Sequence, residues 1–257
     1  MSRKKNRYAC SPGLGYTPFM ANLPVFVGFD WREADAFEVL KKSIDRHSSV
    51  DVDIIPLEHR LLRQTGWFKR PWKIEPGGQF IDLEDGKPFS TEFSHSRFLT
   101  PALARGMGYS GFCLFMDCDF MFRRDVVDLF ELSDPEAAVQ VVKRKWAEPE
   151  GKKMDGMAQC NYPRKLWSSL MLFNLDHPDN VLLTPDEVNT AQGAWMHALG
   201  WLDNYAIGSL PAEWNYIPGV DKGGQAAAVH FSLGIPRMDG YKDSEFAQEW
   251  FSYRESK

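Results

Sequence analysis

The chain has 257 residues, a formal net charge of −5 and 44% hydrophobic residues. This length provides for one large domain or at most two small ones, and the negative charge argues against a nucleic-acid-binding surface over the whole protein. Four cysteines without a C-x-x-C pair argue against a disulfide scaffold and a structural zinc site.

Residues 1–22 are expected to form a flexible basic arm. They lack the apolar core of a signal peptide, and no run in the chain approaches the roughly 18 apolar residues of a membrane span. We therefore expect a cytoplasmic protein with reduced thiols, no transmembrane segment and a single folded domain over 23–257.

Strands and helices are expected to alternate along that domain, which predicts βαβ units and a parallel sheet. A long, partly irregular excursion rich in Gly, Pro and Trp interrupts this order at 63–90. TPDE at 184–187 predicts a helix start, because a capping Thr is followed by Pro and then by Glu. The expected strands are 25–29, 50–57, 111–116, 137–142, 168–175 and 226–234, and the other expected helices are 34–46, 91–105 and 123–132.

Two carboxylates, Asp117 and Asp119, end the apolar stretch GFCLFM at 111–116. Side chains alternate along a strand, so both acids point to one side while Cys118 points to the other. Ligands bind outside the carboxyl ends of strands in open α/β sheets. Two acids at such an end predict a divalent-cation site, and a pair of loop or capping acids is the alternative.

Four short motifs occur in the order expected of GT-A glycosyltransferases: VFVGFD at 25–30, HSRF at 95–98, FMDCDF at 115–120 and VHFSLGIP at 229–236. Over roughly residues 24–240 they resemble the retaining family-eight group, which includes glycogenin and lipooligosaccharide galactosyltransferases. The block at 153–174 resembles a bacterial and phage branch of that group. The resemblance implies an α/β GT-A domain with a Rossmann-like, mostly parallel central sheet flanked by helices.

The resemblance also implies an activity: metal-dependent transfer of a hexose from a nucleotide diphosphate sugar, a UDP-sugar first, to an acceptor hydroxyl with retention. Mn²⁺ is the implied metal, with Mg²⁺ as the alternative, and Asp117, Asp119 and His230 are the implied ligands. The donor sugar, the acceptor and the oligomeric state stay open.

Further residues are assigned by the same resemblance. Arg97 is expected to act on the donor phosphates or sugar, and Asp203 and Asn204 to stand near the reacting carbon. The expected donor-binding residues are Gly28, Phe29, Asp30, Arg97, Cys118, Ser168, Ser169, Gly234 and Arg237. Weaker candidates are Tyr162, Arg164 and Lys165 at a basic rim, and Trp214 and Asn215 on the acceptor side.

The late motif departs from the family pattern H-x-x-G-x-x-K, because Gly234 comes one position late and Arg237 replaces the lysine. Two other functions remain open at this point. A haloacid-dehalogenase phosphatase also carries D-x-D after a buried strand, and a sugar-nucleotide or glycan binding module needs no catalytic cluster.

Overall fold

The structure is a computed structural model that describes residues 22–145 and 163–256. Except for Asn22, the expected basic arm lies outside the described residues. So do residues 153–162 of the block at 153–174, Tyr162 among them.

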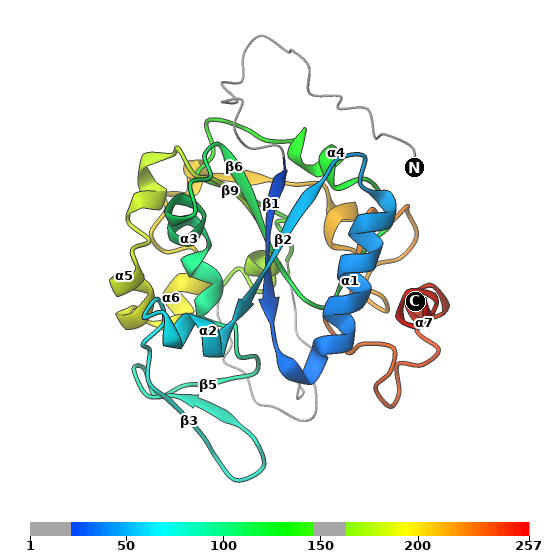
Figure 1. Cartoon of the computed structure of the whole chain (residues 1–257), viewed down its shortest axis with the longest axis horizontal. Coiled ribbons are helices and arrows are strands. Elements are labelled where there is room, and N and C mark those ends of the chain that lie inside the picture. The colour runs from blue at the N-terminus through cyan, green and yellow to red at the C-terminus, as the bar shows by residue number, and fades with distance from the viewer. Residues whose placement is uncertain (1–21, 146–162, 257) are drawn as a thin grey trace.

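A six-stranded sheet with the order β10-β8-β9-β6-β1-β2 forms the centre of the molecule (Figure 1). Its strands are β1 (Leu23–Phe29), β2 (Val52–Glu58), β6 (Phe112–Asp117), β8 (Val139–Val141), β9 (Leu170–Asn174) and β10 (Ile207–Ser209). Strand β1 pairs in parallel with β2 and β6, and β10 pairs in parallel with β8. Strand β9 runs antiparallel to both of its neighbours. The α/β class and the mostly parallel sheet are therefore confirmed, and the reversed strand is an addition to them.

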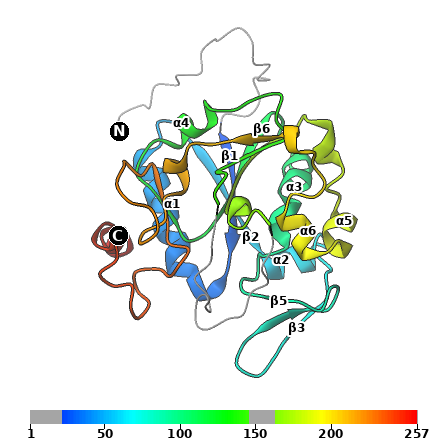
Figure 2. The same cartoon turned by 180° about the vertical axis from the view of Figure 1, so that it is seen from behind.

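Helices cover the sheet on two sides, as the views from the front and from behind show (Figures 1 and 2). Helix α1 packs beside α7 on one side, while α3, α5 and α6 gather on the other. The central strands are fully buried apolar runs, as is expected where both faces of a sheet are covered. The helices are α1 (Ala34–His47), α2 (His59–Gln64), α3 (Thr100–Gly106), α4 (Val126–Phe130), α5 (Pro185–Thr190), α6 (Gly193–His197) and α7 (Ala247–Glu255).

Two small sheets complete the described fold. Strands β7 (Phe120–Phe122) and β11 (Ala228–His230) form an antiparallel pair beside the end of β6. Strands β3 (Trp72–Ile74), β4 (Phe80–Asp82) and β5 (Pro88–Phe89) form an antiparallel sheet that projects from the body at the lower left of Figure 1. The excursion at 63–90 is thus more ordered than the sequence predicts.

Several predicted boundaries are wrong. The helix expected at 91–105 is a turn, a short 3-10 helix (Ser96–Leu99) and then α3, because Ser94 Oγ accepts from the backbone of Thr91 and holds a turn there. Helices α6 and α7 and strands β7 and β10 were not predicted. The start at Thr184 is confirmed, since its Oγ1 accepts a hydrogen bond from the Glu187 amide at 3.1 Å.

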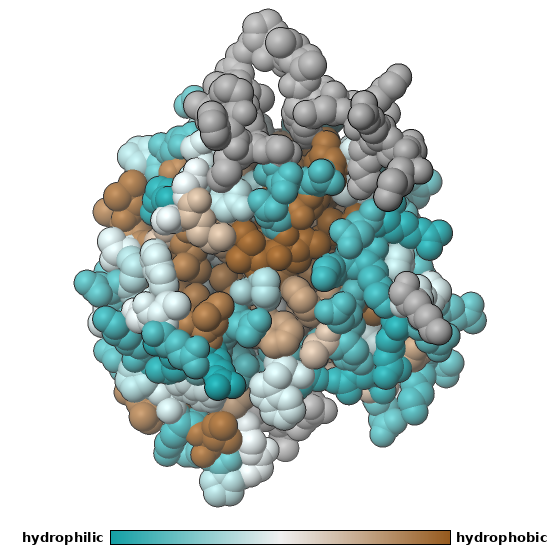
Figure 3. All heavy atoms as spheres, viewed as in Figure 1, coloured by the Kyte–Doolittle hydropathy of each residue, from teal (hydrophilic) through white to brown (hydrophobic). Residues whose placement is uncertain are grey.

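Apolar side chains gather at the centre of the face shown in Figure 3, where Figure 1 shows β1 and β2, and polar side chains surround them. Strand β2 is an edge of the sheet, and its Val52, Ile54 and Ile55 are half-buried. Within the described ranges, no helix combines the length and apolar character needed to cross a lipid bilayer.

Candidate active site

Three strand ends meet at one edge of the central sheet. Gly28 at the end of β1 is paired in register with Asp117 at the end of β6, and Met116 is paired with Leu170 at the start of the reversed strand β9. The end of β6 and the residues that precede β9 therefore lie side by side. A cavity of about 410 Å³ opens over this edge.

Asp117, Asp119 and His230 line this cavity and offer ligand atoms that all lie within 4.8 Å of one another. His230 reaches the two acids because β11 pairs with β7, which places His230 opposite Phe120. Its Nε2 lies 3.3 Å from Oδ1 of Asp119. Two carboxylates and one imidazole form a donor set that suits Mn²⁺ or another first-row divalent cation, so the residues present fit such an ion.

The ring of His230 is held from behind. Its Nδ1 lies 2.8 Å from Oδ1 of Asn215, whose Nδ2 donates to Ser169 Oγ at 3.0 Å. The Asn215 oxygen therefore accepts from Nδ1–H, and the lone pair of His230 is on Nε2, toward Asp119. Hydrogen bonding of the second ring nitrogen is how metal-binding histidines are usually oriented.

Arg97 links the end of β6 to the residues that precede β9. Its Nη1 lies 2.8 Å from Oδ1 of Asp117 and donates to the carbonyl oxygen of Ser168 at 2.8 Å. The guanidinium is buried and lies over the rings of Phe93 and Phe115. Arg97 also lines the cavity, so its position fits a residue that faces a bound donor.

Glu33 is a third acid beside the pair, in the 3-10 helix Trp31–Glu33 that follows β1. It lines the same cavity and is 1% exposed. Cys118 Sγ, buried under the pair, donates to Glu33 Oε2 at 3.5 Å. Burial, and then the charges of Asp119 and Asp30, raise the pKa of Glu33 well above its usual value.

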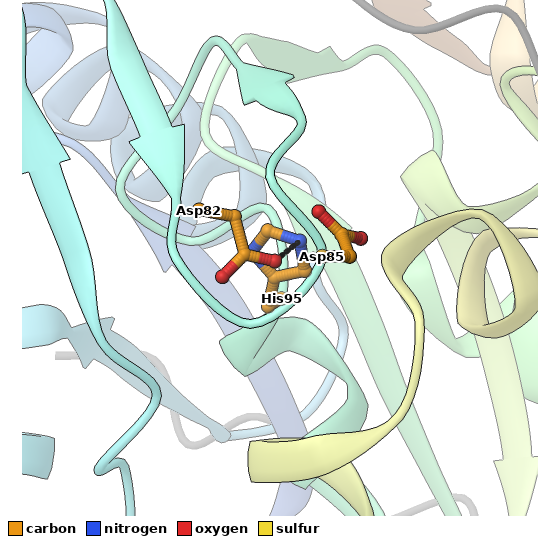
Figure 4. Close-up of side chains that lie close together, drawn as sticks. All are labelled: Asp82, Asp85 and His95. Atoms are coloured by element: carbon orange, nitrogen blue, oxygen red, sulfur yellow. Dashed lines mark ion pairs between the residues drawn. The ribbon is translucent and has the colours of Figure 1, made fainter.

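A second cluster of potential ligands, Asp82, Asp85 and His95, lies in the excursion at 63–90 and just after it (Figure 4). Arg70 occupies this cluster: its Nε and Nη2 donate to Asp82 Oδ2 at 2.9 and 2.5 Å, and Nη2 lies 3.7 Å from Asp85. The guanidinium already pairs with both carboxylates. The cluster is therefore an ion-pair network, and Arg70 and the Gly193 amide, which donates to Asp85, tie the excursion to the start of α6.

Two buried imidazoles line the cavity on this side. Burial and the nearby guanidinium of Arg70 lower the pKa of His95 to about 3. Burial and Arg97 lower the pKa of His197 well below its usual value, and His197 Nδ1 lies 2.9 Å from Ser168 Oγ. Neutral imidazoles and a serine hydroxyl suit the recognition of sugar hydroxyls.

The remaining predicted residues divide into those on the cavity and those off it. Ser168 and Ser169 line it; Cys118 lies beneath the acid pair. Seven predicted residues are not among the described residues that line the cavity: Gly28, Phe29, Asp30, Asp203, Asn204, Gly234 and Arg237.

Most residues off the cavity have structural partners. Asp30 caps the 3-10 helix after β1 and pairs with Arg32 at 2.6 Å. Arg237 pairs with Asp35 at 2.7 Å. Asn204 is exposed and accepts from Arg164. Asp203, Asn204 and Arg237, which the family resemblance suggested, therefore lie off the cavity, and their roles stay predictions.

The two candidates for the acceptor side, Trp214 and Asn215, have different structural roles. Trp214 is 1% exposed and packs beside Phe122 in the core, so it presents no face to a sugar. Asn215, its neighbour, orients His230 instead. Lys165 is buried.

Glu33, Asp85, His95, His197 and Ser232 line the cavity without having been predicted. His95 stood in the motif HSRF, two positions before Arg97, and was open to prediction from that spacing. Ser232 stood in the motif VHFSLGIP, two positions after His230, and was open to prediction in the same way. No local pattern marked Glu33, Asp85 or His197, because tertiary contacts alone bring them to the cavity.

Comparison with curated proteins gives one decisive result. The chain is 40% identical over 237 residues to Protein CDI of Arabidopsis thaliana, which covers 90% of this chain and 85% of that protein. The chain belongs to the family of Protein CDI. No family model matches it. Placement of this CDI family member in a bacterial and phage branch stays a prediction.

Solved structures show which fold this CDI family member has. The bifunctional glycosyltransferase WbbM matches with a TM-score of 0.56 and 16% identity over 94% of this chain. The glycosyltransferase GlyE of Streptococcus pneumoniae TIGR4 matches with a TM-score of 0.56 and 14% identity over 93%. The galactosyltransferase LgtC, solved with donor and acceptor sugar analogs, matches with 0.52 and 13% over 90% of this chain and 95% of its own.

This chain spans 53% of WbbM and 61% of GlyE. The resemblance in fold to GT-A glycosyltransferases, family eight among them, is confirmed. Because the domain has this fold, the haloacid-dehalogenase alternative is set aside.

Proposed function

We propose that this CDI family member is a metal-dependent glycosyltransferase. It would move a hexose from a nucleotide diphosphate sugar, a UDP-sugar first, to an acceptor hydroxyl with retention. The observation that carries the proposal is the meeting of Asp117, Asp119 and His230 within 4.8 Å at a cavity over the strand ends. The GT-A fold supports it.

Asp117, Asp119 and His230 would hold Mn²⁺, with Mg²⁺ as the alternative. The bound ion would supply a Lewis acid for the diphosphate that departs from the sugar. Arg97, already buried beside Asp117, would add fixed positive charge for the same oxygens. Ser168, His95 and His197 would orient the sugar by hydrogen bonds to its hydroxyls.

Calorimetry with Mn²⁺ and UDP tests the proposal, using the wild type and the variants Asp117→Asn and Asp119→Asn. We expect the wild type to bind UDP only with the ion, and each variant to fold but lose that binding. Failure of the wild type to bind UDP in Mn²⁺ or Mg²⁺, or full binding by the variants, would contradict it.

A non-catalytic sugar-nucleotide binding module is the second candidate. The position of Asp203 and Asn204 off the cavity favours it, because the acid and amide expected near the reacting carbon are not there. Hydrolysis of UDP-glucose and UDP-galactose without an acceptor separates the two candidates. Hydrolysis that is lost in Asp119→Asn supports the enzyme, and UDP binding without hydrolysis supports the module.

A further inference from the structure

Glu33 is a buried carboxylate whose contacts do not account for its position. Its Oε2 accepts from Cys118 Sγ at 3.5 Å, and a thiol is a weak donor. Within the described part of the chain, its Oε1 is buried and has no hydrogen-bond partner. A buried polar oxygen in this state is costly, so its position calls for a ligand.

The charges around Glu33 point to a cation. Asp30 and Asp119 both act on it, and both carry the same sign of charge. The two guanidiniums nearby are engaged elsewhere: Arg32 pairs with Asp30 at 2.6 Å, and Arg97 pairs with Asp117 at 2.8 Å. Among the described residues, Glu33 has no ion pair of its own. Both guanidiniums are thus engaged with other acids, and neither pairs with Glu33.

Glu33 is too far from the ligand set to belong to it directly. The three groups whose ligand atoms lie within 4.8 Å of one another are Asp117, Asp119 and His230, without Glu33. Yet Glu33 lines the same cavity as these three. A carboxylate at the border of a cation site typically accepts hydrogen bonds from water on the ion.

We propose that Glu33 is a positioning residue of the metal centre: its carboxylate accepts a hydrogen bond from a water molecule on the cation that Asp117, Asp119 and His230 hold. The inference rests on the proposed function, since it needs that cation. It assigns Cys118, the middle residue of the acid pair, to holding the far oxygen of Glu33.

The experiment measures Mn²⁺ binding by the loss of the free-ion EPR signal, with and without UDP, for the wild type, Glu33→Gln and Glu92→Gln. Glu92 is the matched control, because its backbone also contacts Asp30 but it does not line the cavity. We expect Glu33→Gln to raise the Kd for Mn²⁺ by about 10–100-fold and Glu92→Gln to leave it unchanged. Melting without metal is measured alongside, and Glu33→Gln should melt no lower than the wild type, because it removes like-charge repulsion.

Several outcomes would overturn the inference. One is a Kd for Mn²⁺ within about twofold of wild type in Glu33→Gln; another is lost affinity together with lower metal-free melting, which marks a structural role. If Glu33→Gln does not fold, a crystal structure of the wild type with Mn²⁺ decides, and absence of any metal-bound water within hydrogen-bond distance of Glu33 rejects the inference. A wild type that binds no Mn²⁺ rejects the proposed metal centre itself, which separates the two failures.

Discussion

Arg97 and Asp117 form a buried ion pair at the point where β6 ends, with 2.8 Å between Nη1 and Oδ1. The same nitrogen donates to the carbonyl of Ser168, just before β9, and Nε donates to the carbonyl of Ser94. One guanidinium therefore fixes the orientation of the first acid relative to the wall of the cavity. Whatever Arg97 does for a donor, it also holds Asp117 in position.

Replacing Arg97 by Lys should weaken binding of UDP in the presence of Mn²⁺ by about 10–100-fold. Lysine keeps the charge, but a single ammonium cannot make the three directed contacts of the guanidinium. Calorimetry measures the loss, and circular dichroism checks the fold. Arg105→Lys on α3 is the control, since Arg105 contacts Asn180 and lies off the cavity. Equal binding by Arg97→Lys and the wild type would show that Arg97 does not position Asp117.

Asn215 should control metal affinity through His230. In Asn215→Leu the Nδ1 of His230 loses its acceptor, so we expect weaker Mn²⁺ binding, by about 10–100-fold, and a loss of stability of about 1–3 kcal/mol from the unpaired buried group. Asn215→Asp keeps an acceptor at the same place and should recover most of the metal affinity. EPR titration measures the first effect and urea unfolding the second. If both variants bind Mn²⁺ as the wild type does, Asn215 does not orient the ring.

Local sequence patterns were sufficient for the strands β1, β6 and β9 and for the acid pair, because buried strands are continuous apolar runs and charges at their ends stand out. They were not sufficient for the pairing of β7 with β11, which places His230 beside Asp119 across more than a hundred residues. His230 was assigned from the family resemblance instead. Pairing between distant strands depends on the whole fold, which no short window contains.

The same limit applies to the other candidate site residues. Asp203 and Asn204 were assigned from the family resemblance, and both are exposed, with Asn204 against Arg164; their roles stay predictions. Asp85 and His197 come from the excursion and from α6, two segments that the sequence marked only as irregular or not at all. Arg70 and Asp82, buried in one ion-pair network, hold these segments together.

Gly28 makes room for a ring. A Cβ built on Gly28 would lie 2.3 Å from Cδ2 of Phe93, which is itself 1% exposed and lies under Arg97. Gly28→Ala should therefore lower stability by about 1–3 kcal/mol through overpacking, as urea unfolding would measure. Phe93→Leu in the same chain should restore part of the loss. A stable Gly28→Ala variant with weakened UDP binding would instead favour the predicted contact between Gly28 and the nucleotide.

Arg70 should carry much of the stability of the excursion. Asp82 is 1% exposed, so Arg70→Met leaves a buried charge without its partner and should cost about 3–5 kcal/mol in the free energy of unfolding. Adding Asp82→Asn removes that charge, and the double variant should be more stable than Arg70→Met alone. Urea unfolding of the wild type, Arg70→Met, Asp82→Asn and the double variant measures the coupling between the two residues. Effects that add to within about 0.5 kcal/mol would mean that the pair is not coupled.

His59 should make stability depend on pH. Its Nε2 accepts from Arg63 Nε at 2.7 Å and from Trp72 Nε1 at 2.9 Å, and burial together with the charge of Arg63 lowers the pKa of His59 to about 4. The unfolded chain binds this proton near pH 6.5, so the stabilisation is fully present above about pH 6.5 and is lost as pH falls toward about 4.

Urea unfolding between pH 7.5 and 4.5 measures this loss, whose slope is at most about 1.4 kcal/mol per pH unit for each proton. His95 and His197 have lowered pKa values and contribute with the same sign. In His59→Gln, a neutral side-chain oxygen takes the place of the acceptor nitrogen, so the decline should be shallower than in the wild type. Parallel curves for the two proteins would show that His59 already binds its proton in the folded state as readily as in the unfolded one.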